Sequence, residues 1–264
     1  MGMTIKDIKQ VKTRRGQEYD VTLETGEVQR FPGITTGLGV MDKPALKFWS
    51  AKLEREHCVE SAFKLYQITK NLNLMSREEY SATLRDRLGR GYAFNRTLKR
   101  AQDTGSTAHA AIEHWVKVKL GQATGPGPAL SDDGAYIAFE SFKDWAKDAD
   151  LAPYAAETRI CSLEHGFAGT VDLVATVNGY ATLIDFKTSK AVYISHLMQA
   201  CAYHVAFEEM GRGTLNGSLV VRLPKDLDGD CAVEVVTVPP VEEIWPGVEA
   251  ALDLWKFLQT REAA

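Results

Sequence analysis

The spacing of apolar and polar residues predicts a short β region at the start of the chain, followed by a mainly helical segment. Residues 1–31 alternate between apolar and polar positions, and Gly16 and Gly26 stand where turns would fall, which indicates a β-hairpin region. From 42 to 150 the apolar residues recur at helical spacing. A Gly- and Pro-rich loop at 121–134 divides this segment.

One helix start within this segment has a specific signal. Ser76-Arg77-Glu78-Glu79 has the serine and glutamate spacing of a capping box, in which two side chains satisfy free backbone N–H groups. We therefore expect a helix to begin immediately after Ser76.

The period changes in the last part of the chain, from 153 to 264, where short apolar runs of strand length dominate. The expected strands are 158–163, 169–177, 180–186, 217–223 and 231–238, and the expected helices are 193–210 and 242–259. The resulting order is β-β-β-α-β-β-α. This order predicts an α/β (α+β) fold, with a mixed central sheet flanked by helices, in a single domain spanning 1–264.

A β-hairpin within this core brings charged residues together. Asn178-Gly179 between two apolar runs is a strong signal for a two-residue hairpin turn. Such a turn pairs residues whose numbers sum to 357, so Asp172 is expected directly opposite Asp185. Lys187 then lies on the same face, opposite Thr170, because side chains alternate along a strand.

Two opposed carboxylates need a physical explanation. At a separation of roughly 5 Å and an effective dielectric constant of 20, their repulsion is about 3 kcal/mol. Either one carboxyl keeps its proton, or a cation lies between them, and a hard ion such as Mg²⁺ prefers these oxygen ligands. A structural charge cluster at a sheet edge is the remaining alternative, but it gives no reason for acids in apolar strands.

Composition and charge exclude some classes of protein. The 264 residues are 45% hydrophobic and carry a net charge of −4, so the chain lacks the basic field of a protein that packages DNA. Its cysteines form no CxxC pair, which disfavours zinc and a disulfide framework and predicts core positions instead. These cysteines are Cys58, Cys161, Cys201 and Cys231.

The chain also lacks membrane and export signals. No run of apolar residues is long enough for a transmembrane helix, and the start MGMTIKDIKQ has no apolar core. We therefore expect a cytoplasmic protein with no membrane partner, in a bacterium or a phage-infected host.

Five segments together resemble a known family. They are GTVD (169–172), IDFKTS (184–189), QACAY (199–203), GSTAHAAIEH (105–114) and FPGITTGLGVMDKPALKFW (31–49). Their order and spacing resemble the PD-(D/E)XK nuclease superfamily, and within it the RecB-like exonuclease branch. The last segment is similar to the opening of mitochondrial genome maintenance exonucleases and phage exonucleases. The resemblance implies a restriction-endonuclease-like core at 153–264.

The resemblance also implies a metal site. Asp172 and Asp185 would bind one or two Mg²⁺ or Mn²⁺ ions, with the backbone carbonyl of Phe186 as a further ligand. His109 would complete the site from the helical part of the chain, and Glu157 would be an outer or second-metal ligand.

Other residues would act on water or substrate. By resemblance, Lys187 orients and helps deprotonate the attacking water. Gln199 and Tyr203 share one helix face, which supports the site and contacts the DNA strand. Glu113, one turn from His109, is either close to the metal ligands or solvated.

The chain departs from some relatives in its cofactors. Members of this branch that hold an iron–sulfur cluster use closely spaced cysteines, and Cys58 and Cys231 have no such companions, so no cluster is expected. No GxxxxGK[ST] sequence is present, so we expect no nucleotide cofactor.

A basic segment, Arg85–Arg100, is a second candidate for DNA contact. Tyr92 could stack on unpaired bases and arginines could bind phosphates, although a solvated face or a core role is equally compatible. The candidate arginines are Arg90, Arg96 and Arg100.

The sequence thus predicts a metal-dependent exonuclease for single-stranded DNA or DNA ends, acting in recombination, replication or repair. A recombinase or a single-strand-binding protein would be its partner. The alternatives are a structure-specific or restriction-like endonuclease, a catalytically silent DNA-binding protein, and a small-molecule hydrolase with a carboxyl dyad. The last of these leaves Gln199 and Tyr203 unexplained.

Overall fold

The computed structural model of the protein describes residues 4–14, 16–41, 43–69, 76–89, 92–130, 132–226 and 232–262. In chain order, its elements are β1 (Ile5–Thr13), β2 (Gly16–Leu23), β3 (Val28–Pro32), α1 (Ile34–Gly37), the 3₁₀ helix η1 (Leu38–Val40), α2 (Pro44–Thr69), α3 (Arg77–Leu88), α4 (Ala93–Lys119), α5 (Asp133–Asp148), β4 (Ala152–Ser162), β5 (Phe167–Val177), β6 (Tyr180–Lys187), α6 (Ile194–Glu209), β7 (Gly217–Arg222), β8 (Glu234–Thr237) and α7 (Val241–Glu262).

The central sheet has five strands in the order β4-β5-β6-β7-β8. β6 and β7 are parallel and are connected through α6, whereas the other neighbours are antiparallel. This is the predicted order β-β-β-α-β-β-α and the predicted mixed sheet, so the fold class is confirmed. β4 begins at Ala152, six residues before the expected start of that strand.

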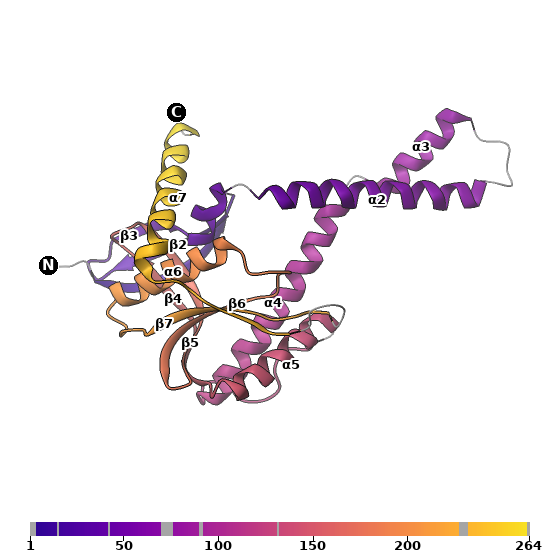
Figure 1. The fold of residues 1–264 in the computed structure, drawn as a ribbon. Helices are drawn as coiled ribbons and strands as arrows, with labels where there is room; N and C mark the ends of the chain where they lie inside the picture. Colours follow the sequence, from indigo (N-terminus) through magenta and orange to yellow (C-terminus); the bar gives the residue numbers. More distant parts are fainter. Residues whose placement is uncertain are drawn as a thin grey trace. The chain divides into compact units, whose positions relative to one another are not determined.

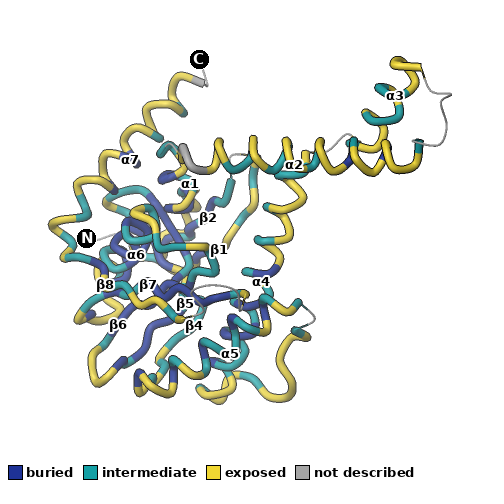
Figure 2. Tube along the Cα trace, turned by 45° about the vertical axis from the view of Figure 1, so that its right-hand side comes forward, coloured by how far each residue is buried: buried dark blue, intermediate teal, exposed yellow. Residues whose placement is uncertain are grey.

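Each face of the central sheet is covered by helices (Figure 1). On one face, Val171, Val174 and Leu183 pack against α6, α7 and the short α1. On the other face, Leu173 and Ile184 pack against α5 and the C-terminal part of α4. Both faces of β5 and β6 are therefore buried, as Figure 2 shows in dark blue, and any charged group in these strands lies in a water-poor layer.

α6 packs against β5 through one close approach. Gly169 of β5 leaves room for the ring of Tyr203 on α6, because a Cβ atom at residue 169 would lie 2.3 Å from Tyr203 Cε1. Tyr203 is buried. Glycine at 169 is thus required by the packing of a large ring against the strand.

The N-terminal segment forms a three-stranded antiparallel sheet, β1-β2-β3, so the expected hairpin region gains a third strand. Ile8, Tyr19 and Val21 pack against Cys161 and Ala168 of the central sheet. Arg159 Nη1 also donates a hydrogen bond to the Ile8 carbonyl at 3.0 Å, and Gly33 forms an isolated parallel bridge with Ala168. The N-terminal sheet therefore has a defined place beside β4 and β5.

The chain divides into two compact units. The sheet unit comprises Met1–Met41 and Gly105–Ala264, and the helical unit comprises Asp42–Thr104. α4 begins in the helical unit and ends in the sheet unit. The expectation of one domain over 1–264, with a helical part at 42–150 and a core at 153–264, stays a prediction.

The helical unit has its own contacts. Trp49 of α2 and Phe94 of α4 meet edge to face with ring centroids 5.4 Å apart, and the Phe94 N–H donates to Glu54 Oε1 at 2.8 Å. Ser76 caps α3, since its Oγ accepts from the Glu79 N–H at 3.1 Å and Glu79 Oε2 accepts from the Ser76 N–H at 2.8 Å. The predicted capping box is confirmed. No helix in the described part of the chain is long and apolar enough to cross a membrane.

The packing of Gly169 against Tyr203 predicts the effect of a single methyl group. Gly169→Ala forces the ring or the strand to move, and overpacking of this kind costs about 1–3 kcal/mol of unfolding free energy. Urea unfolding of the variant and of the wild type measures this loss of unfolding free energy. Gly217→Ala is the matched control, since a Cβ at this strand residue meets nothing within 4 Å.

A double substitution tests the cause. In a Tyr203→Ala background the cost of Gly169→Ala disappears, because the ring that causes the clash is gone. An equal cost in both backgrounds would contradict the packing explanation.

The cysteines generate a second prediction. The predicted core position is confirmed for Cys161 and Cys201, which are buried, and is wrong for Cys58, which is exposed on α2; Cys231 lies outside the described residues. Burial raises the pKa of Cys161 to about 12 and that of Cys201 to about 11. Because the thiolate is the nucleophile, iodoacetamide at pH 8 should alkylate Cys58 well before either buried thiol, as read by peptide mass mapping of the native protein. Similar rates at all three positions would show that the buried pair is accessible.

Candidate active site

The β5–β6 hairpin has the predicted turn and register up to a defined point. Asn178 and Gly179 both adopt positive φ, as this turn requires. The expected pairs are confirmed from Val177–Tyr180 through Leu173–Ile184. The ladder ends there, one pair before Asp172 and Asp185, so their direct pairing stays a prediction.

A side chain replaces the ladder at this point. The Phe186 N–H donates to Asp172 Oδ2 at 2.7 Å instead of to a backbone carbonyl of β5. On the other side of β6, Asp185 pairs with Val220 of β7. The two acids lie close enough for Asp172 to affect the ionisation of Asp185.

The acid that faces Asp172 across the sheet comes from β4. Glu157 lies between Ala156 and Thr158, whose partners are Leu173 and Val171, so its position is opposite Asp172. Glu157 has φ of +49°, an unusual value for a residue within a strand. The predicted opposition of Lys187 and Thr170 lies beyond the last pair of the β5–β6 ladder and stays a prediction.

Asp185 is the most deeply buried charge of the group. It is 1% exposed, its Oδ2 lies 2.5 Å from Lys187 Nζ, and its Oδ1 accepts from Gln199 Nε2 at 3.1 Å. The predicted placement of Lys187 beside Asp185 is confirmed. Asp185 Oδ2 contacts the Lys187 ammonium as an ion pair but does not meet the geometry of a hydrogen bond. Among the described residues, it is the buried side-chain polar atom that has no hydrogen bond.

The ionisation of these groups follows from their surroundings. Burial, together with repulsion from Asp172, raises the pKa of Asp185 to about 6 despite the nearby Lys187. Burial alone would also raise the pKa of Asp172, but the His109 ring and its hydrogen bond lower it overall. Burial and the charges of Asp172 and Glu113 raise the pKa of Glu157 to about 7.

His109 reaches the strands from α4. Its Nδ1 lies 3.5 Å from Asp172 Oδ1, and although burial would lower its pKa, Asp172 raises it overall. The helix can come this close because Gly105 has no side chain, since a Cβ there would lie 3.0 Å from Thr188 Oγ1. Gly105, four residues before His109, therefore has a packing role.

Gln199 and Tyr203 connect α6 to the same acids. Gln199 Nε2 donates both to Asp185 Oδ1 and, at 3.0 Å, to Tyr203 Oη. Both residues are buried, and the pKa of Tyr203 is raised well above its ordinary value by burial. In this structure the pair positions Asp185 and also lines the pocket, while contact with a DNA strand stays a prediction.

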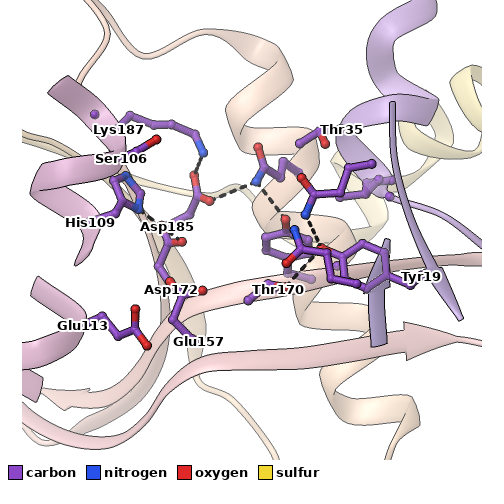
Figure 3. A pocket seen from close by; sticks show the side chains of 18 of the residues that line it. Tyr19, Thr35, Ser106, His109, Glu113, Glu157, Thr170, Asp172, Asp185 and Lys187 are labelled. Atoms are coloured by element: carbon purple, nitrogen blue, oxygen red, sulfur yellow. Dashed lines mark hydrogen bonds and ion pairs between the residues drawn. The ribbon is translucent and has the colours of Figure 1, made fainter. Parts of the chain in front are cut away.

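A pocket of about 480 Å³ collects these groups. Figure 3 shows Lys187, Asp185 and Asp172 in succession, with Glu113 and Glu157 beside Asp172 and with Tyr19 and Thr170 on the other side. The predicted site residues that line it are His109, Glu157, Asp172, Asp185, Lys187, Gln199 and Tyr203.

The remaining predicted residues are not part of this pocket wall. Phe186 meets the site through its N–H, which donates to Asp172, and through its ring, which lies edge to face with His109 at 6.4 Å between centroids. The ring also packs in the core, with its centroid 5.3 Å from that of Phe142, and a ligand role for the Phe186 carbonyl stays a prediction. Tyr92, Arg96 and Arg100 belong to the helical unit, where Tyr92 is 68% exposed. Arg90 lies outside the described residues.

One wall of the pocket was missed by sequence reasoning. Gln10, Gln17 and Tyr19 of the N-terminal sheet line it together with Thr35. Tyr19 Oη accepts from Gln17 Nε2 at 2.8 Å and lies 3.1 Å from Thr170 Oγ1. No local pattern marks these residues; only the resemblance at 31–49 pointed to this part of the chain.

The donor set fits a hard divalent cation. Two carboxylates and an imidazole converge, and Asp185 Oδ2 is buried without a hydrogen bond among the described residues. The Lys187 ammonium and the His109 ring now contact these carboxylates, so an ion here would replace contacts that each acid makes with a cationic side chain.

Another cluster has ligand atoms closer together. Glu164, His165 and Glu209 are the described His/Cys/Asp/Glu group whose ligand atoms all lie within 4.8 Å of one another. Both glutamates are partly or fully accessible, and none of the three lines the pocket. We assign it no role.

Comparisons with known proteins identify the family of this chain. A model of the PD-(D/E)XK nuclease superfamily matches residues 77–252. Similar solved structures include that of SSO0001 (15% identity, TM-score 0.29), covering 46% of this chain and 59% of that one. Another is named "Putative exonuclease" from Eubacterium rectale (9% identity, TM-score 0.36), covering 59% of this chain and 68% of that one.

The family match extends over more of the chain than either structural likeness. The chain spans less than two thirds of the length of SSO0001, and no curated protein matches it. The family model covers more than half of the chain, including the pocket acids, Lys187 and the α6 pair. The chain belongs to the PD-(D/E)XK nuclease superfamily.

Proposed function

We propose that this nuclease is a metal-dependent DNA exonuclease that acts on single-stranded DNA or DNA ends in recombination, replication or repair. The observation that carries the proposal is the buried Asp185–Lys187 pair, 2.5 Å apart, in one pocket with Asp172 and His109. A buried pair of this kind is costly to maintain, and its position in the pocket lining favours chemistry over structure.

The acids and the imidazole would hold the ion. Asp172, Asp185 and His109 are the ligands we assign, with the Phe186 carbonyl and Glu157 as further candidates. When bound, Mg²⁺ or Mn²⁺ would polarise the scissile phosphate and favour deprotonation of an attacking water. Gln199 keeps Asp185 oriented toward the pocket by its hydrogen bond to Oδ1, which leaves Oδ2 for the ion.

Lys187 would act on the water. Its side chain is 19% exposed, so the ammonium has contact with the pocket as well as with Asp185. An ammonium beside the reacting phosphate orients water by donating hydrogen bonds, and it offsets the charge that builds up in the transition state. Proton transfer by a positioned side chain contributes typically 10²–10⁴-fold in rate.

The size of the pocket supports a single strand as the bound form. About 480 Å³ accommodates a nucleotide-sized part of one strand, whereas a base-paired duplex is much larger. A strand that enters alone comes from single-stranded DNA or a frayed end. An endonuclease with the same chemistry is the alternative, and the substrates below separate the two.

Metal binding is testable without catalysis. Mg²⁺ or Mn²⁺ should stabilise the folded protein relative to EDTA, by about 2.7 kcal/mol of unfolding free energy at an ion concentration a hundredfold above Kd. The melting temperature should therefore rise. Asp185→Asn should abolish the increase, as measured by thermal unfolding. Asp144→Asn, an exposed acid on α5, should retain it. An undiminished shift in Asp185→Asn would remove Asp185 from the metal site.

Cleavage is tested with labelled linear and circular DNA, each single- and double-stranded, with Mg²⁺ or Mn²⁺. We expect linear single strands to be degraded while circles survive. Lys187→Ala should lower the cleavage rate by about 10²–10⁴-fold, and Lys190→Ala, an exposed lysine three residues along, should not.

The outcomes are distinct. Cutting of circles would support an endonuclease. Full activity of Lys187→Ala would overturn the role of that residue, and binding without cutting under either metal would favour a silent DNA-binding protein.

A further inference from the structure

Gln17 is held at the pocket wall more firmly than an ordinary strand residue. Its carbonyl accepts from the Gly33 N–H at 2.8 Å and from Thr36 Oγ1 at 2.9 Å, and its own N–H donates to Thr36 Oγ1 at 3.2 Å. Its side chain donates to Tyr19 Oη at 2.8 Å. These four hydrogen bonds fix both the backbone and the side chain.

Neighbouring residues are adapted to this arrangement. A Cβ at Gly33 would lie 2.9 Å from the Gln17 carbonyl oxygen, and a Cβ at Gly16 would lie 2.8 Å from Thr36 Oγ1. Gly16 also has φ of +124°. Two glycines and the Thr36 hydroxyl thus serve to place one glutamine, although none of the proposed catalytic groups contacts it through a hydrogen bond among the described residues.

The Gln17 amide has further hydrogen-bonding capacity. One N–H bonds to Tyr19, which leaves the second N–H and Oε1 for a ligand in the pocket that Gln17 lines. Tyr19 in turn contacts Thr170 of β5, so the amide is part of a neutral network anchored on the central sheet.

A cation stands next to this amide. Lys12 is the direct partner of Gln17 in the β1–β2 register, and Gln10, two residues earlier on the same face, also lines the pocket. Directly opposed Cβ atoms lie about 5 Å apart. Lys12 is exposed, and no acidic side chain in the described part of the chain forms an ion pair with it.

The two walls of the pocket therefore differ in charge. Glu113, Glu157, Asp172 and Asp185 line one wall and repel phosphate, whereas Gln10, Gln17 and Tyr19 line the other without any negative side chain. Amide N–H groups and lysine ammonium groups are common ligands of nucleic-acid phosphates. The neutral wall with its flanking cation is suited to a phosphate that is not the one being cut.

We propose that Gln17 and Lys12 form a subsite for the backbone phosphate of a nucleotide next to the scissile bond. The proposal rests on the proposed function, because it concerns the same pocket and a DNA strand. Gln17 supplies a preoriented N–H, and Lys12 supplies charge. Both are positioning residues that hold the strand against the acidic wall.

Salt dependence of binding tests the subsite. A labelled oligothymidylate is titrated with the protein in EDTA, so that the strand stays intact, over a series of KCl concentrations, with fluorescence anisotropy as the readout. The logarithm of the association constant K falls with log[KCl], and the slope should be less negative by about 0.7 in Lys12→Gln, because one phosphate contact is lost. Lys9→Gln is the matched control, since Lys9 is exposed on the same strand but points to the other face, opposite Asp20.

Kinetics with Mg²⁺ give a second readout. Lys12→Gln and Gln17→Leu should raise KM severalfold with kcat within about twofold, because the contact acts on binding of the strand and not on the reacting atoms. Thermal unfolding checks that each variant is folded.

Each outcome has a clear meaning. Wild-type protein that neither binds nor cuts DNA would overturn the proposed function itself. Wild-type protein that binds and cuts DNA, with Lys12→Gln equal to Lys9→Gln in slope and KM, would overturn the subsite alone. An equal loss in both lysine variants would also overturn it, because a diffuse charge effect would then explain the binding.

Discussion

The site depends on keeping the charge of Asp185, which is 1% exposed, in a strand that is buried on both faces. β6 is covered on both faces, so the carboxylate has only the partners that the protein supplies: Lys187 on the same strand and Gln199 on α6. Loss of one partner of a buried ion pair costs about 3–5 kcal/mol. The position of α6 on the sheet, which Gly169 permits, is therefore part of the electrostatics of the site.

The parts of the site that were predictable are those encoded by local sequence. Asn178-Gly179 determined the hairpin register, Asp185 and Lys187 share a face because strands have a period of two, and Gln199 and Tyr203 share a face because they are four residues apart on a helix. These relations need only backbone geometry. The β-β-β-α-β-β-α order followed from apolar spacing for the same reason.

The rest depends on contacts that no local pattern specifies. The ladder ends at Leu173–Ile184 because a side chain, that of Asp172, takes the Phe186 N–H, and extrapolation of the register could not foresee this competition. Glu157 came to face Asp172 through the pairing of β4, whose start was placed six residues late. Tyr19 and Gln17 reach the pocket across a separation of about 150 residues, where sequence spacing carries no information.

That separation has a consequence for the order in which the protein acquires its site. The hydrogen bond between Tyr19 and Thr170 closes a loop that includes more than half of the chain, and contacts between such distant residues form late and slowly in folding. During synthesis, β1 and β2 leave the ribosome long before β5, β6 and α6 exist to meet them. The acidic wall and the neutral wall can therefore face each other only after α6 has been made, so a nascent chain that ends before α6 carries the N-terminal strands without a complete pocket.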